Sequence, residues 1–267
     1  MTHTETERRF PARLEHFRAV DSTQRVVREW LDEGVPEVCL AVADYQTAGR
    51  GRHGREWVAP PTLALLLSAG FRPDHLEAQH AWRLPAIVAL AMRDAAEETA
   101  GLRDGTLWLK WPNDIVADAP DGTMRKVAGV LGESTAAGER VETAVVGIGI
   151  NSDWKMTDFP WAIARTMTSL RELAGKRPID NQQLLDAFLA RLEPRYEALR
   201  VGQFDSGGWS AAQRTTGRTV VVDLGGGENV TGVGMGVHPE TGALLVRSDH
   251  GKDVAVDSGE VIRCRVL

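Results

Sequence analysis

Glycine and arginine alternate in a short polar stretch, Gly49 to Arg55, which holds three residues of each type in seven positions. Glycine allows the backbone to approach a ligand closely. Arginine supplies a permanent, fork-shaped cation that matches carboxylate and phosphate groups. Because the whole chain has a formal net charge of −6, the stretch concentrates positive charge locally, and we predict that it binds an anionic ligand. A solvated turn and an RNA-binding arginine–glycine segment are the alternatives.

A second polar group follows a strand-like segment, in the sequence Lys110-Trp111-Pro112-Asn113-Asp114. Proline ends a strand because it lacks an N–H, and Asn-Asp is common turn chemistry. A plain strand end therefore accounts for the motif. Asp114 is equally a candidate to bind magnesium or to position an amine, so both interpretations stay open at this point.

Lys126 begins an otherwise apolar strand. The two-residue period of a strand predicts that Lys126 shares a face with Ala128 and Val130. Lysine is rarely buried without a partner. Its ammonium group therefore either reaches solvent at the strand end or faces a bound anion.

Two further segments place polar groups or glycines where a ligand meets the backbone. Asp21-Ser22-Thr23 precedes a helical stripe, which suits a helix N-cap and equally suits a polar ligand at the helix start. Gly147-Ile148-Gly149-Ile150-Asn151 resembles part of a dinucleotide fingerprint, but the third glycine and a following helix are missing. The alternative is a glycine-rich strand end on which a nucleotide lies closely.

The composition is that of an ordinary globular protein, with 43% hydrophobic and 25% charged residues in 267. The two cysteines, Cys39 and Cys264, form neither a disulfide framework nor a metal-binding pattern, which predicts a reducing, cytoplasmic location. No apolar run is long enough for a membrane span, and Met1 to Phe10 lacks the apolar core of a signal peptide. The acidic balance argues against nucleic acid as the main partner.

The elements that must position these residues follow from hydrophobic patterning. We expect strands at 38–43, 62–68, 106–111 and 141–150, and a hairpin of 115–117 with 127–131. We expect helices at 24–31, 78–101 and 161–173, and a further helix capped by Asp180. Beyond Gly207-Gly208 the chain reads as about five short strands separated by turns, which predicts a small barrel.

Taken together, these segments resemble the biotin protein ligases. The motifs that carry the resemblance are Asp21-Ser22-Thr23, Gln46, residues 48–57, Lys110 to Asp114, Lys126 to Leu131, Gly147 to Asn151 and Thr168-Ser169-Leu170. The resemblance covers about Asp21 to the C-terminus. It implies an α+β fold with a mixed sheet flanked by helices, like a class II synthetase, and a C-terminal SH3-like barrel. We place the catalytic domain at 1–210 and the small domain at 211–267.

The resemblance also implies a two-step reaction in which biotin and Mg·ATP give biotinyl-5′-adenylate, and a lysine of a biotin carboxyl carrier protein then takes the biotinyl group. Lys126, Arg50, Arg52 and Arg55, with Mg²⁺ near Asp114, would offset the repulsion between the two anions, and Asp114 would orient the amine. No metal site of the protein's own is expected. The resemblance assigns biotin or adenylate binding to Ser22, Thr23, Gln24, Gln46, Gly49, Arg50, Gly51, Arg52, Trp57, Asn113, Lys126, Gly129, Gly149 and Asn151.

Two rival functions remain. A lipoate or octanoate ligase shares the chemistry, but those acyl groups lack the ureido ring that Ser22, Thr23 and Gln46 would bind. A nucleic-acid-binding module is disfavoured by the net charge. Only twenty residues precede Asp21, too few for a winged helix-turn-helix domain, which predicts a ligase-only protein. We expect a monomer or a weak homodimer with no membrane partner.

Overall fold

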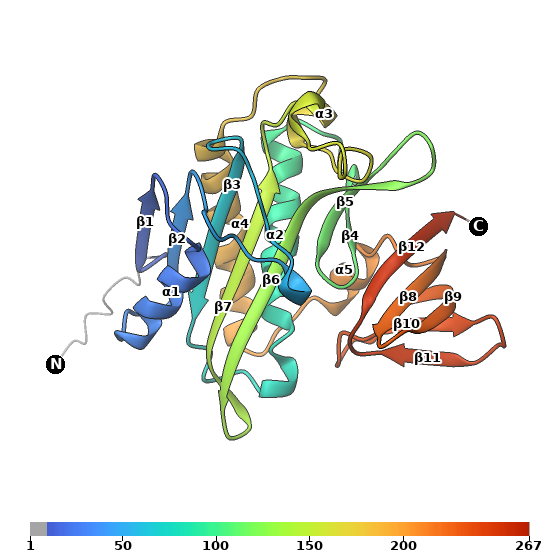
Figure 1. Ribbon diagram of the computed structural model, residues 1–267. Coiled ribbons are helices and arrows are strands. Elements are labelled where there is room, and N and C mark those ends of the chain that lie inside the picture. The colour runs from blue at the N-terminus through green and yellow to red at the C-terminus, as the bar shows by residue number, and fades with distance from the viewer. Residues whose placement is uncertain (1–9, 267) are drawn as a thin grey trace.

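A seven-stranded mixed sheet forms the centre of the molecule in this computed structural model, which describes residues 10–266 (Figure 1). The strand order is β1-β2-β3-β7-β6-β5-β4, with β1 and β2 parallel and every other pair antiparallel. The expected α+β fold with a mixed sheet is confirmed. The strands are β1 (Arg13–Phe17), β2 (Cys39–Ala43), β3 (Ala64–Phe71), β4 (Leu107–Lys110), β5 (Asp114–Asp118), β6 (Met124–Ala137) and β7 (Arg140–Asn151).

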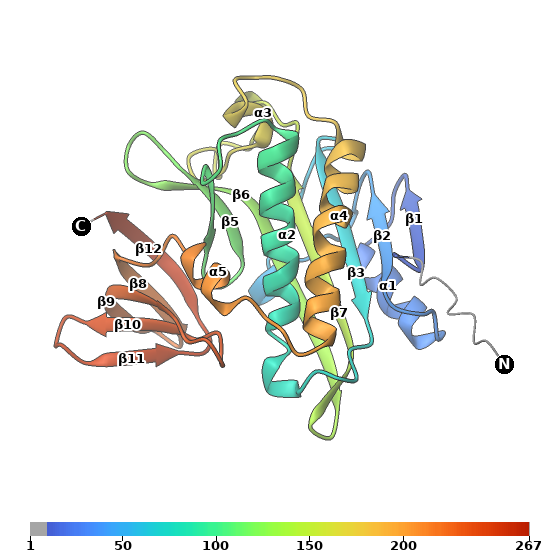
Figure 2. The ribbon, with the colours of Figure 1, turned by 180° about the vertical axis from the view of Figure 1, so that it is seen from behind.

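Helices cover both faces of this sheet. The long helices α2 (Arg83–Thr99) and α4 (Asn181–Arg200) lie side by side across one face, as Figure 2 shows, and α1 (Thr23–Asp32) packs on the opposite face against β2, β3 and β7. Every residue of β2 and β3 is buried as a consequence. Continuous apolar strands of this kind are stable only when both faces of the sheet are covered.

The helix expected at 161–173 is wrong over most of its length, because only α3 (Leu170–Leu173) is helical. Thr166 and Thr168 pair instead with the backbone of Lys126, whose N–H donates to Thr166 O at 2.8 Å and whose C=O accepts from Thr168 N at 2.9 Å. Ser169 then begins α3, since its side chain accepts a hydrogen bond from the N–H of Glu172. Pairing with a strand edge has replaced helical bonding here.

The C-terminal part forms a separate sheet, and its five predicted strands are confirmed. The hydrogen-bond order β11-β10-β9-β8-β12 is antiparallel throughout. This strand order does not show whether the sheet closes into a barrel, so the barrel stays a prediction. The domain boundary at 210 also stays a prediction. The elements are α5 (Ser206–Ala211), β8 (Arg218–Gly225), β9 (Glu228–Val237), β10 (Leu244–Ser248), β11 (Asp253–Val256) and β12 (Glu260–Val266).

An ion-pair cluster ties the two sheets together at the end of β5. The Asp118 carboxylate accepts from both Arg214, at 3.0 Å from Nε, and Arg218, at 2.9 Å from Nη2. Arg218 is 5% exposed, so Asp118 supplies the opposite charge that a buried guanidinium needs. Backbone bonds between Leu109 and Ala212, at 2.9 Å, reinforce the connection. No helix in residues 10–266 is long and apolar enough to cross a membrane.

Asp118→Asn removes the charge that Arg218 faces, and we expect it to lower the free energy of unfolding by about 1–3 kcal/mol at neutral pH. Burial alone would raise the pKa of Asp118, but the hydrogen bond from Arg214 and the charge of Arg218 outweigh it and lower the pKa below its ordinary value of 3.8. A lowered pKa stabilises the fold above the ordinary value, and the effect disappears as the pH falls through the folded-state pKa.

Urea denaturation at a series of pH values measures this contribution. The difference between Asp118→Asn and the native chain should be constant near neutrality and shrink below pH 3.8. Asp249→Asn, at an exposed turn position, is the control and should match the native chain. A difference that persists unchanged into acid would contradict the electrostatic origin.

Candidate functional site

A cavity of about 1070 Å³ opens between the face of the central sheet that carries α1 and the edge of the C-terminal sheet. It is lined by the loop between β2 and β3, by the β4–β5–β6 region, by β7, by the segment before α3 and by β12. Every candidate residue from the sequence lines it except Gly49, although these residues are spread over about 130 positions. The seven lysines and arginines in its lining outnumber its four aspartates and glutamates.

Gly49 has a different place, at the base of the arginine–glycine loop. Its C=O accepts from Trp57 N at 2.9 Å, and a side chain at residue 49 would lie 2.3 Å from the Trp57 carbonyl oxygen. Within the loop, Gly51 N donates to Arg55 O at 2.7 Å. The glycines therefore let the two arms of the loop approach each other, with His53 (φ 56°) and Gly54 (φ 72°) making the turn.

Two opposed glycines form part of the cavity floor. Gly129 on β6 and Gly149 on β7 are direct register partners. A Cβ at Gly149 would lie 2.4 Å from Trp57 Nε1, and one at Gly129 would lie 3.1 Å from the same indole. The pair thus makes room for Trp57 to pack against the sheet. The indole Nε1–H of Trp57 is buried and has no hydrogen-bond partner within residues 10–266.

A β-bulge turns Lys126 into the cavity. Ile115 pairs with Ala128 and Val116 pairs with Lys126, so Val127 is an extra residue in β6. An extra residue shifts the alternation of the strand by one. Ala128 therefore packs in the core beneath the helices, whereas Lys126 shares the opposite face with Gly129. The prediction that Lys126 shares a face with Ala128 and Val130 is wrong for this reason.

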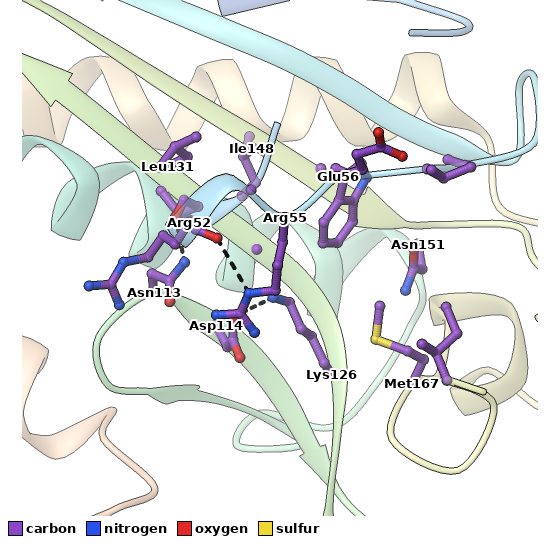
Figure 3. Close-up of a pocket in the computed structure, with 18 of the residues that line it drawn as sticks. Arg52, Arg55, Glu56, Asn113, Asp114, Lys126, Leu131, Ile148, Asn151 and Met167 are labelled. Atoms are coloured by element: carbon purple, nitrogen blue, oxygen red, sulfur yellow. Dashed lines mark hydrogen bonds and ion pairs between the residues drawn. The ribbon is translucent and has the colours of Figure 1, made fainter. Parts of the chain in front are cut away.

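Lys126 meets two chemically different neighbours in the cavity. Its Nζ lies 2.6 Å from Asp114 Oδ1 and 5.3 Å from the centroid of the Trp57 ring. Figure 3 shows the ion pair beside Arg52 and Arg55. The bulge is what brings these groups together, since Asp114 lies opposite Gly129 in the register. Because Lys126 and Asp114 are paired with each other, a ligand that binds one of them would compete with the other.

Each loop arginine contacts an oxygen atom that lies outside the loop. Arg52 Nη1 donates to Gly259 O at 3.1 Å, Arg55 Nη1 donates to Glu260 Oε1 at 3.0 Å, and Arg50 Nη2 lies 3.3 Å from Glu133 Oε1. The hydrogen bond from Arg55 lowers the pKa of Glu260, so this carboxylate stays charged. These contacts attach the loop to Gly259 and to β12. The sequence patterns predict a strand there but do not indicate that it contributes to the site.

A neutral polar group lies at the start of α1. Thr23 donates to Gln46 Oε1 from its backbone N at 2.8 Å and from Oγ1 at 3.1 Å, and its hydroxyl lies 2.8 Å from Ser68 Oγ. Ser22 occupies the N-cap position without a side-chain capping bond, so its hydroxyl is not used by the helix. Gln24 donates to Leu131 O at 2.9 Å. Ser68 was not anticipated because its strand is otherwise apolar.

The two asparagines support the cavity wall. Asn113 Nδ2 donates to Val130 O at 2.9 Å, which fastens the β4–β5 turn to β6. Asn151 is buried and donates to Thr168 O at 3.1 Å, which fastens the segment before α3. Contact of either side chain with a nucleotide stays a prediction. Lys110, Trp154, Met167, Arg263 and Arg265 also line the cavity.

The arrangement suits one particular kind of ligand. Neutral hydrogen-bonding groups gather around Thr23, and cations gather around Lys126 and the loop, within one cavity. A molecule with a neutral polar head and an anionic tail matches both. In the part of the chain that the structure describes, no group of three or more His, Cys, Asp or Glu side chains forms a metal site.

The fold is a mixed sheet covered by helices on both faces, and a cavity on one face of that sheet is lined by a cationic loop. Residues 16–151 match the model of the biotin/lipoate A/B protein ligase family. The chain belongs to this family.

Curated relatives agree with that assignment. A biotin–[acetyl-CoA-carboxylase] ligase from Mycobacterium tuberculosis is 31% identical over 85% of this chain and 79% of its own. The bifunctional ligase/repressor BirA of Bacillus subtilis is 36% identical over 66% of this chain and 51% of its own. The matched region thus spans about half the length of that BirA protein.

Solved structures have the same fold. The biotin protein ligase from Aquifex aeolicus, in complex with biotin and ATP, superimposes with a TM-score of 0.76 and 28% identity, covering 94% of this chain and 99% of that one. A second structure of biotin protein ligase from Aquifex aeolicus gives a TM-score of 0.72 at 26% identity, covering 96% of this chain and 99% of that one.

Gly149→Ala should displace Trp57, because the new methyl would lie 2.4 Å from the indole nitrogen. We expect the loop to loosen and trypsin to cleave after Arg50, Arg52 and Arg55 about fivefold faster or more, in line with the energy of overpacking. Mass spectrometry of the fragments measures this. Gly207→Ala, whose methyl would meet only an ordinary contact at 3.6 Å, is the control. Equal cleavage of both variants would contradict the packing argument.

Proposed function

We propose that this protein is an ATP-dependent ligase that joins biotin to a lysine of a biotin carboxyl carrier protein through biotinyl-5′-AMP. The observation that carries the proposal is the single cavity in which a neutral polar group and a cationic loop face the same space. The names of the mycobacterial relative and of the Aquifex complex support the substrates biotin and ATP. The proposed setting is the cytoplasm.

The first step joins two anions. A carboxylate oxygen of biotin bonds to the α-phosphorus of ATP, and the bond to pyrophosphate breaks. Unit charges about 4 Å apart repel by about 4 kcal/mol at an effective dielectric of 20. Lys126, Arg50, Arg52 and Arg55 offset that repulsion and stabilise the charge that develops in the transition state.

Magnesium enters with ATP as part of the substrate. Magnesium in nucleotide sites is held by one or two carboxylates together with phosphate oxygens. Asp114 lines the cavity beside Lys126 and fits that role. The ion would supply further positive charge next to the phosphates.

The second step transfers the biotinyl group. The amine nitrogen of the acceptor lysine bonds to the acyl carbon, the bond to the phosphate oxygen breaks, and AMP leaves. The lysine must first lose a proton. When Lys126 turns to the phosphate, its partner Asp114 is left as a carboxylate that orients the amine and accepts this proton.

The polar group around Thr23 favours biotin over lipoate. The ureido ring of biotin has two N–H donors and a carbonyl acceptor. Ser22, Thr23, Gln46 and Ser68 offer hydroxyl and amide groups that both donate and accept. The acyl tail of lipoate or octanoate has no ureido group, so it would satisfy none of the remaining hydrogen-bonding capacity of these groups, which is unfavourable.

One experiment tests the function directly. The protein is incubated with biotin, Mg·ATP and a purified carrier domain, and covalent label is detected with streptavidin. A parallel reaction replaces biotin with lipoate. Labelling with biotin alone is expected. Labelling with lipoate alone would identify a lipoate ligase, and absence of any label together with absence of pyrophosphate release would overturn the proposal.

Lys126→Ala should reduce biotin-dependent ATP–pyrophosphate exchange by about a hundredfold or more, the usual effect of losing one preorganised charge. Thermal unfolding should change little, because Lys126 lies at the cavity surface and not in the core. Lys252→Ala, at an exposed position in the turn between β10 and β11, is the control. Undiminished exchange would remove Lys126 from the first step.

Asp114→Asn should affect the second step most. We expect transfer from preformed biotinyl-5′-AMP to the carrier to slow by about a hundredfold or more, within the range for loss of a general base. Raising the pH should restore part of the rate, because the acceptor lysine then loses its proton to solvent. Transfer at the native rate at every pH would show that Asp114 has no role with the amine.

A further inference from the structure

Three large apolar side chains are exposed around the cavity. Trp161 is 90% exposed, Val58 is 67% exposed and Ile262 is 51% exposed. They come from three separate segments: the residues before α3, the end of the arginine–glycine loop and β12. Val58 and Ile262 line the cavity, as do Pro160 and Ile163 on either side of Trp161. Two of the three thus line the cavity and the third lies between two lining residues, so one partner covering the cavity would cover apolar side chains from all three segments.

Trp161 is presented on a well-fastened turn. The preceding residues are anchored by Trp154 and Phe159, whose stacked rings are 4.5 Å apart and buried. Ile163 N donates to Pro160 O at 2.9 Å, directly across Trp161. A tryptophan on a fixed backbone turn has only its side chain left to order when a partner covers it, and tryptophans are enriched among the residues that dominate the binding energy of interfaces.

The second reaction step determines what must cover this surface. A lysine side chain has only four methylene groups, so an acceptor lysine reaches the cavity only if its own backbone lies at the opening. Any acceptor domain then contacts the residues around that opening. Three further cations of the lining, Lys110, Arg263 and Arg265, have no part in the proposed first step, and they favour a partner whose surface carries carboxylates.

We propose that Trp161, with Val58 and Ile262, forms the docking surface for the acceptor domain, which presents an apolar patch flanked by carboxylates beside its lysine. This inference rests on the function proposed above. Trp161 contacts the protein acceptor and takes no part in forming the adenylate.

Trp161→Ala separates docking from chemistry when three rates are measured. The first is ATP–pyrophosphate exchange with biotin. The second is the reaction of the enzyme-bound adenylate with hydroxylamine, a nucleophile too small to need docking. The third is transfer to a purified carrier domain. We expect the first two to be unchanged and the KM for the carrier to rise about 30-fold, as for an interface hot spot, with kcat at saturation preserved.

Two matched variants complete the test. Val201→Ala removes an apolar side chain that is 71% exposed at the end of α4 and should leave all three rates unchanged. Trp161→Phe retains an aromatic anchor and should recover most of the affinity for the carrier. A native KM in Trp161→Ala would overturn the inference.

Other outcomes also decide the matter. Loss of exchange in Trp161→Ala would show that the indole serves the nucleotide and not the acceptor. Light scattering that finds a dimer in the native chain and a monomer in Trp161→Ala, with the KM for the carrier unchanged, would assign the surface to self-association. If the native chain labels no carrier, the proposed function fails by itself, independently of Trp161.

Discussion

The site depends on positive charges that are held close together around one cavity. Arg50, Arg55 and Lys126 surround one cavity, and each is paired with a carboxylate: Glu133, Glu260 and Asp114 respectively. These carboxylates come from β6, β12 and β5. They offset the mutual repulsion of the cations, and a ligand with phosphate and carboxylate groups competes for the same positions. A locally basic cavity is thereby stable within an acidic chain.

Backbone geometry is what gives a ligand access to these charges. The bulge at Val127 moves Lys126 from the helix-covered face of the sheet to the cavity face. The opposed glycines Gly129 and Gly149 leave space above the sheet that Trp57 enters. Both features change the shape of a regular sheet by the size of one residue or one side chain, which is the scale on which a small molecule is recognised.

The C-terminal sheet contributes directly to the cavity. Glu260 and the carbonyl of Gly259 hold Arg55 and Arg52, and the ion pairs of Asp118 fix this sheet against the end of β5. The position of the arginine–glycine loop is therefore determined by contacts across more than 200 residues of sequence. A lone catalytic sheet would leave these two guanidinium groups without those partners.

Local patterns in the sequence were sufficient for most elements and for many of the residues that line the cavity. Apolar runs identify the central strands except β1, Asp180 marks the start of α4 through its capping bonds, and the motifs from Ser22 to Asn151 contain many of the lining residues. These features depend on residues that are near each other in the chain, so local composition is enough to predict them. The family resemblance rests on the same motifs.

Tertiary structure alone decided the rest. The two-residue period cannot reveal the bulge at Lys126, since an extra residue is visible only in the register with β5. Residues 166–168 bond to Lys126 in place of forming a helix, because a strand edge is available there only after the sheet has formed. The pairing of Arg55 with Glu260 likewise has no local signal. The sequence determined which chemical groups the site contains, and long-range backbone pairing determined which way they face.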